Sequence, residues 1–188
     1  MSSSLRHLPN IISVARILLV GPIIWCLLNG EFTLAIWLFL LAGASDGLDG
    51  FLAKRFGWSS RLGGILDALA DKFLLISTFV CLWWLGIFPW WLVLSVLARD
   101  LLIVIGATVY NFRIEAVQPE PTLISKLNTV LQIALAAVGV AALGFTGIPA
   151  WVVQALIWAV MLTILLSGTG YVREWSRRAR VVGGRNDV

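Results

Sequence analysis

Four aspartates stand close together in a chain that is otherwise strongly apolar. They are Asp46, Asp49, Asp67 and Asp71. Members of the first pair are three residues apart and members of the second pair four, so within a helix each pair would share one face. Ionisable side chains inside an apolar segment are costly and by default indicate a functional site. The spacing therefore predicts two carboxylate pairs, each on one helix, which a short connection brings to the same depth.

Electrostatic repulsion limits what such a cluster can do. Four carboxylates in a low-dielectric site cannot all stay ionised without compensation by protons or cations. Carboxylate oxygens are hard ligands that suit Mg²⁺, Mn²⁺ or Ca²⁺, and four of them can hold one or two divalent ions. Paired metals are a recurrent arrangement for displacement at phosphorus, so the residues predict metal-dependent phosphate chemistry. Two alternatives stay open here: aspartates that only cap helices, and carboxylates that bind the moving cation or proton of a small transporter.

The elements that would hold these aspartates are membrane helices. Of the 188 residues, 60% are hydrophobic and 13% are charged, whereas soluble domains are about half apolar and a quarter charged. About 20 apolar residues cross a bilayer, and six segments of roughly that length are present: 10–28, 32–51, 63–85, 90–110, 124–144 and 150–171. We therefore predict an all-α integral membrane protein with six transmembrane helices, forming a single domain over residues 1–188 with a basic tail at 173–188. No cleaved signal peptide is expected.

The basic residues predict the orientation of this bundle. All fourteen Lys and Arg residues can be assigned to one side, and the three turns near Asn29, Pro89 and Gly147 contain none. Positive residues mark the cytoplasmic side, so both termini and the aspartates are expected in the cytoplasm, and a bacterial inner membrane is the expected location. The basic tail is expected to rest on anionic lipid headgroups. No nucleic-acid partner is expected.

The aspartate stretch also carries a longer pattern. From Asp46 to Asp71 it reads D-x-x-D-G-x-x-A-K-x8-G-x3-D-x3-D, which resembles the signature of the CDP-alcohol phosphatidyltransferases. The departure is Lys54, where that signature has arginine. Lysine keeps the charge but loses the planar fork that binds phosphate two ways. The neighbouring Arg55 is the alternative residue for that role.

Three further segments extend the resemblance over nearly the whole chain. L-P-N-I-I-S-V-A-R, which ends at Arg16, is similar to the opening of the family. Ala98-Arg99-Asp100 resembles the basic and acidic pair of the family's fourth span. P-T-L-I-S-K-L-N-T, at 121–129, resembles the acceptor-side motif of phosphatidylglycerophosphate synthases and CMP-forming cardiolipin synthases, and its S-K-x-N-T form favours the second group.

The resemblance implies a fold and a reaction. The family's fold has six spans with a short amphipathic N-terminal segment on the cytoplasmic surface, and is usually a homodimer. The implied reaction transfers a phosphatidyl group from CDP-diacylglycerol to an alcohol acceptor and releases CMP, with two divalent metal ions, Mg²⁺ or Mn²⁺. The expected acceptor is phosphatidylglycerol, which would give cardiolipin. Glycerol-3-phosphate is the alternative acceptor.

The resemblance also implies roles for individual residues. It makes Asp46, Asp49, Asp67 and Asp71 the metal ligands, and Asp71 also the general base that takes the proton from the acceptor hydroxyl. The residues implied for CDP binding are Asn10, Asp49, Gly50, Ala53, Lys54 and Gly63. The small residues among them leave room for the nucleotide, although small residues also gather where helices pack closely.

An acceptor that carries phosphate requires positive charge. The candidates are Arg99, Arg113 and Lys126. Arg99 lies within an apolar span and could instead form an internal salt bridge with Asp100, and Lys126 could instead extend to the membrane interface. Lys72 is expected on a different helix face from Asp71, so it is not included.

Overall fold

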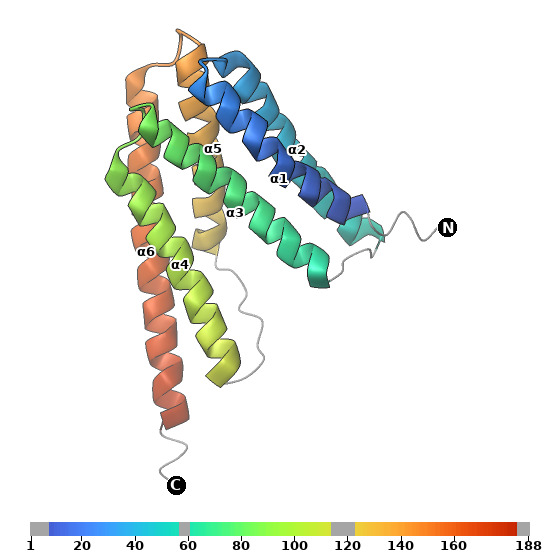
Figure 1. Ribbon diagram of the computed structural model, residues 1–188. Helices are drawn as coiled ribbons and strands as arrows, with labels where there is room; N and C mark the ends of the chain where they lie inside the picture. Colours follow the sequence, from blue (N-terminus) through green and yellow to red (C-terminus); the bar gives the residue numbers. More distant parts are fainter. Residues whose placement is uncertain (1–7, 57–60, 114–122, 184–188) are drawn as a thin grey trace.

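All the elements that the structure describes are helices. The structure, a computed structural model, describes residues 8–56, 61–113 and 123–183 (Figure 1). Side chains are not described within 8–10, 46–56, 106–113 and 169–183, nor for 61, 62, 64–66 and 68. The helices are α1 (Leu8–Leu28), α2 (Phe32–Phe56), α3 (Arg61–Trp84), α4 (Trp90–Arg113), α5 (Leu123–Gly144) and α6 (Ala150–Gly183). Each predicted apolar segment falls within or closely matches one of these helices, and α6 continues beyond its segment into the basic tail.

Glycines end two of the helices where the sequence predicts tight turns. Gly30 and Gly86 have φ values of 80° and 79°, a left-handed conformation that glycine adopts without a steric penalty. After each of them the next amide closes the helix end: Glu31 N–H donates to Cys26 O at 2.9 Å, and Ile87 N–H donates to Leu82 O at 2.9 Å. This Schellman pattern satisfies carbonyls that the helix end would otherwise leave unpaired.

The helices form three antiparallel pairs that share one core (Figure 1). The α1–α2, α3–α4 and α5–α6 turns lie at the upper end of the bundle in this view, and the start of α1 and the end of α6 lie away from them. α1 packs against both α2 and α3, and α5 packs against α2, α3 and α6. α3 therefore packs between α1 on one side and α4 and α5 on the other.

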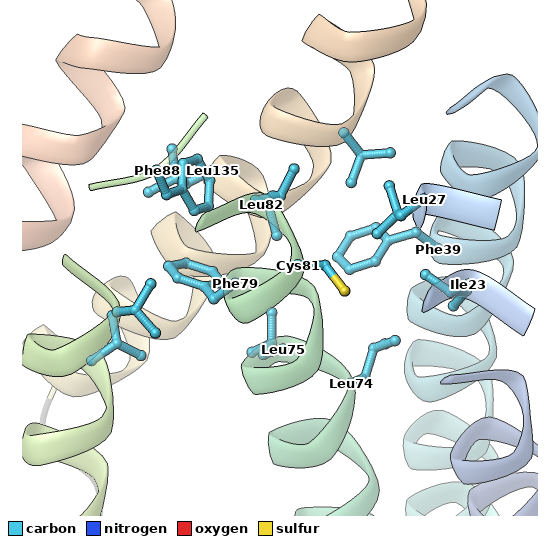
Figure 2. Close-up of a cluster of buried hydrophobic side chains, with 14 of the residues drawn as sticks. Ile23, Leu27, Phe39, Leu74, Leu75, Phe79, Cys81, Leu82, Phe88 and Leu135 are labelled. Atoms are coloured by element: carbon cyan, nitrogen blue, oxygen red, sulfur yellow. The ribbon is translucent and has the colours of Figure 1, made fainter. Parts of the chain in front are cut away.

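The apolar core surrounds the second half of α3 (Figure 2). It combines the following buried side chains from several helices and the α3–α4 turn: Ile23, Leu27, Phe39, Leu74, Leu75, Phe79, Leu82, Phe88 and Leu135. The rings of Phe79 and Phe88 lie 5.1 Å apart at an interplanar angle of 56°, a favourable tilted contact. Gly139 of α5 meets this cluster so closely that an added Cβ would lie 2.9 Å from Leu82 Cδ1. The glycine therefore permits the close approach of α5 to α3.

The outer surface fits a lipid environment. Three segments in the described part of the chain are long and apolar enough to cross a membrane: Ile11–Leu28, Leu123–Gly144 and Ala150–Gly168. α2 has a shorter apolar run at Phe32–Ser45. Charged residues interrupt the apolar sequence of α2, α3 and α4. The structure thus confirms the all-α class and six helices in the described residues, while composition supports three of them as spans. The predicted amphipathic N-terminal segment lies outside the described residues.

Exposed tryptophans gather at the end of the bundle that holds the tight turns. Trp25 is in the last turn of α1, Trp84 ends α3, Trp90 begins α4 and Trp151 lies in the first turn of α6. All four are exposed. Indole rings concentrate at membrane–water interfaces. We conclude that this end of the bundle has the composition of an interface, opposite the end of α3 that holds the aspartates.

Candidate functional site

Two of the predicted metal ligands meet at a single point beside α1. Asp67 and Asp71 lie one turn apart in the first half of α3. Arg16 Nη1 donates to Asp67 Oδ1 at 3.2 Å and to Asp71 Oδ1 at 2.9 Å. Because one nitrogen serves both carboxylates, the two side chains converge on the same place. The prediction that Asp67 and Asp71 share one helix face is therefore confirmed.

Burial differs sharply between the two sides of this cluster. The Arg16 side chain is 0% exposed, whereas the side chains of Asp67 and Asp71 are each 39% exposed. Ser13, one turn before Arg16, adds a hydrogen bond from its Oγ to Asp67 Oδ1 at 3.3 Å. The carboxylates thus have a buried polar wall behind them, supplied by α1, and an open side.

The other half of the predicted metal site is placed by backbone alone. Asp46 and Asp49 lie in the second half of α2, 10 and 7 residues before its last residue. Asp71 and Asp67 lie 10 and 6 residues after the first residue of α3. Their side chains lie outside the described ones, and so do those of Asn10, Gly50, Ala53 and Lys54. Gly63, in the first turn of α3, is half-buried. Convergence of all four aspartates stays a prediction.

The donor set fits a divalent ion. Asp67 and Asp71 supply carboxylate oxygens, which Mg²⁺ and Mn²⁺ prefer, from one partly exposed face. Among the described side chains no three of the types His, Cys, Asp and Glu come together as a metal-binding group. Two ligands of the expected set are therefore described, and the remaining pair would come from α2.

A second polar cluster lies beside the first and joins four helices. Arg99 Nη1 donates to Asp100 Oδ1 at 2.8 Å, and Arg99 Nη2 donates to Ser125 Oγ at 2.6 Å and to Ser167 Oγ at 3.4 Å. Lys72 Nζ donates to the other oxygen of Asp100. Arg99 is 7% exposed and Asp100 is 8% exposed. These contacts link α3, α4, α5 and α6 through charged groups that are mostly buried.

All residues of the two clusters except Ser167 fall inside a family match. The model of the CDP-alcohol phosphatidyltransferase family matches residues 6–166 of the chain. The chain belongs to the CDP-alcohol phosphatidyltransferase family. The region that matches this family includes the four aspartates, Arg16, Arg99 and Ser125, whereas Ser167 lies one residue beyond it.

Individual relatives in this family carry two kinds of name. The chain is 28% identical over 194 residues to a "Cardiolipin synthase (CMP-forming)" of Rattus norvegicus, a match that covers 95% of the chain and 64% of the relative. It is 42% identical over 107 residues to a protein of that name from Streptomyces coelicolor, covering 53% and 50%. It is 35% identical over 185 residues to "CDP-diacylglycerol--glycerol-3-phosphate 3-phosphatidyltransferase 1, chloroplastic" of Oryza sativa, covering 88% and 56%. The chain thus spans less than two thirds of each of these relatives.

The three predicted acceptor-side residues of this family member differ from one another in their surroundings. Arg99 makes the internal ion pair with Asp100 that was the alternative to acceptor binding, yet its second terminal nitrogen faces Ser125 and Ser167. Lys126 is exposed, and it is the neighbouring Ser125 that contacts Arg99. Arg113 ends α4, and its side chain lies outside the described ones. Acceptor binding by these three residues stays a prediction.

Sequence reasoning left several residues of the two clusters without a role. Arg16 appears in it only as part of the opening motif, although a charged residue inside an apolar span is itself a signal of function. Lys72 was set aside because it follows Asp71. Its side chain points away from the Arg16 contacts of Asp71 and donates to Asp100. Lys72 therefore belongs to the cluster around Arg99. The partners lie on other helices, so their distances depend on packing.

A row of buried polar side chains continues from the Arg99 cluster along α5. Ser125, Asn128 and Gln132 are spaced by three and four residues and are all buried. Asn128 Oδ1 accepts a hydrogen bond from Thr163 Oγ1 at 2.8 Å. Gln132 is 1% exposed, and in the described part of the chain neither of its amide atoms has a hydrogen-bond partner. The row therefore ends in a buried amide whose hydrogen-bonding capacity is not met by described protein groups.

Proposed function

We propose that this protein transfers a phosphatidyl group from CDP-diacylglycerol to an alcohol and releases CMP, in a reaction that requires two divalent ions, Mg²⁺ or Mn²⁺. The observation that carries this proposal is the convergence of Asp67 and Asp71 on one point of a partly exposed face. Within this family, the convergence supports a site for cations and diphosphate. The transporter alternative gains no support from the relatives.

Each aspartate has a role in this proposal. Asp46, Asp49, Asp67 and Asp71 would hold the two ions, which when bound would neutralise charge on the diphosphate and on the departing phosphate. Asp71 would also accept the proton of the acceptor hydroxyl. The hydroxyl oxygen then bonds to the β-phosphorus. The bond from that phosphorus to the bridging oxygen breaks, and CMP leaves with the electron pair.

Small and basic residues would hold the nucleotide. Asn10, Gly50, Ala53 and Gly63, together with Asp49, would contact CDP, since small residues let the ligand approach the backbone closely. Lys54 or Arg55 would supply positive charge to the diphosphate. The match of the chain to the family signature supports these assignments.

For the acceptor we favour phosphatidylglycerol, which would make the product cardiolipin. Two of the three relatives described above bear the name of a CMP-forming cardiolipin synthase. Glycerol-3-phosphate is the second candidate, because the rice relative is 35% identical over most of this chain. Both acceptors carry phosphate. Arg99, with Arg113 and Lys126, would bind that phosphate.

We also propose an orientation and an assembly. Both termini and the active site would face the cytoplasm of a bacterial inner membrane, with the protein as a homodimer. The tryptophan-rich end supports this orientation, because its three turns contain no Lys or Arg and positive residues mark the cytoplasmic side.

The decisive experiment is an assay with a single purified enzyme and separate acceptors. The full chain in mixed micelles receives CDP-diacylglycerol labelled in the lipid, with phosphatidylglycerol or glycerol-3-phosphate, and with Mg²⁺, Mn²⁺ or EDTA. We expect CMP and labelled cardiolipin with phosphatidylglycerol, and no turnover in EDTA. Product with glycerol-3-phosphate alone would move the function to the second candidate. The absence of CMP release with both acceptors would refute the proposal. Full turnover in EDTA would refute metal dependence. Glu31→Gln, which changes an exposed carboxylate at the opposite turn, serves as the matched control and should retain activity.

A further inference from the structure

Arg16 contacts two of the proposed metal ligands, yet the proposed reaction gives it no role. It lies in the first half of α1, fully buried, and one nitrogen binds Oδ1 of both Asp67 and Asp71. These two aspartates belong to α3, 51 and 55 residues further along the chain. The contact is therefore made by the packing of α1 against α3.

A buried arginine is stable only when opposite charge and hydrogen bonds compensate for its removal from water. The two carboxylates meet that requirement for Arg16. In return, the guanidinium offsets the repulsion between two carboxylates that lie one turn apart. Each side therefore depends on the other, and neither would keep this geometry alone.

The contacts also fix the direction of the carboxylates. Arg16 Nη1 donates to the Oδ1 atom of each aspartate, and Ser13 Oγ donates to the same Oδ1 of Asp67. Hydrogen bonds to one oxygen of a metal-binding carboxylate orient the group, and such outer partners affect metal affinity strongly. The open side of the pair is the partly exposed one, where an ion would enter.

We propose that Arg16 is a positioning residue of the metal site, which holds Asp67 and Asp71 together and aims them at the divalent ions. Ser13 assists it at Asp67. The inference rests on the proposed function, because it takes these two aspartates to be metal ligands. In this role Arg16 acts on the ions through the two carboxylates that it contacts.

A purely structural role is the competing explanation. Arg16 could only lock α1 to α3, in which case its loss would destabilise the protein without changing the intrinsic affinity of the folded site for metal. Metal affinity measured on folded protein separates the two explanations. Arg99 provides a matched control, because it is also a buried arginine in an ion pair but contacts Asp100 and two serines rather than Asp67 or Asp71 in the described structure.

The test is a titration of the full chain in detergent with Mn²⁺ alone, in which the electron paramagnetic resonance signal of free Mn²⁺ reports binding. Arg16→Met should weaken Mn²⁺ binding by about 10- to 100-fold, the usual effect of removing an outer partner of a ligand. Arg16→Lys keeps the charge on a shorter side chain and should restore part of the affinity. Ser13→Ala should cause a smaller loss, and Arg99→Met should bind Mn²⁺ as the unaltered protein does.

The outcomes separate this inference from the proposed function. If the unaltered protein shows no saturable Mn²⁺ binding, the metal-dependent function fails and the inference fails with it. If the unaltered protein binds Mn²⁺ and the Arg16 and Ser13 variants bind it equally well, the inference alone is overturned. An equal loss in Arg99→Met would also overturn it, because the loss would then follow from removing any buried arginine. If Arg16→Met does not fold, Arg16→Lys and Ser13→Ala still decide the question.

Discussion

Lys72 and Asp100 form an ion pair that joins α3 to α4. Lys72 follows Asp71 directly in α3, and Asp100 follows Arg99 directly in α4. The pair therefore connects the helix that holds the proposed base to the helix that holds the proposed acceptor-binding arginine. Asp100 accepts a hydrogen bond from Lys72 on one carboxylate oxygen and from Arg99 on the other.

Asp100→Asn should destabilise the protein and impair the use of an acceptor. The change leaves Arg99, which is buried, without its counter-charge, and breaking a buried pair in this way costs roughly 3–5 kcal/mol. Thermal unfolding in detergent should show a lowered midpoint, and the KM for the acceptor should rise. Lys72→Met is the comparison, because the Lys72 side chain is 37% exposed and should contribute less. An unchanged midpoint in Asp100→Asn would contradict a stabilising ion pair between Asp100 and the buried Arg99.

Asp71→Asn should remove turnover while metal binding is largely kept. Loss of a general base lowers kcat by about 10²- to 10⁴-fold, whereas asparagine retains a carbonyl oxygen and three aspartates would still bind the ions. Steady-state CMP release and an Mn²⁺ titration on the same preparation measure the two properties. Activity near that of the unaltered enzyme would exclude Asp71 as the base. A parallel collapse of Mn²⁺ affinity would instead assign it to metal binding alone.

Arg99→Lys should affect the acceptor more than the donor. A lysine ammonium cannot reproduce the planar fork that contacts Asp100 and two serines at once, and a hydrogen bond to a charged group is worth about 1.5–3 kcal/mol. We expect kcat/KM for phosphatidylglycerol to fall by roughly 10- to 100-fold, with a nearly constant KM for CDP-diacylglycerol. Lys126→Met tests the neighbouring candidate, whose side chain is exposed. A larger loss in that variant than in Arg99→Lys would transfer the role to Lys126.

Gln132→Leu should stabilise the protein. The amide of Gln132 is buried, and it has no hydrogen-bond partner among the described residues, so an apolar side chain of similar size removes a desolvation cost of about 1–3 kcal/mol. The midpoint of thermal unfolding should rise by about 3 to 9 °C. Gln154→Leu changes an exposed glutamine of α6 and should leave the midpoint unchanged. A lower midpoint in Gln132→Leu would indicate that the amide binds an ordered water or ligand that the protein needs.

The helices and the tight turns could be predicted because both depend on local sequence. Apolar runs of about 20 residues form membrane helices, and glycine at 30 and 86 marks the helix ends. Asp67 and Asp71 could be paired for the same reason, since a spacing of four residues fixes their relative direction within one helix.

The contacts between helices could not be predicted in this way. Arg16 reaches Asp67 only because α1 packs against α3, and nothing in the spacing of the two residues encodes that packing. Lys72 illustrates a further limit, because a neighbour in sequence points to a different side of its helix and its partner there was unknown. Gln132 was missed because a single amide within an apolar run gives no indication of what lies opposite.

The tight α3–α4 turn at Gly86 has a mechanical consequence. α3 has 24 residues and is therefore about 36 Å long, so a change of roughly 10° in its angle to α4 would displace its far end by about 6 Å. The two helices diverge towards that end (Figure 1). The Lys72–Asp100 pair lies about midway along α3 and α4, where it limits how far the two helices can separate.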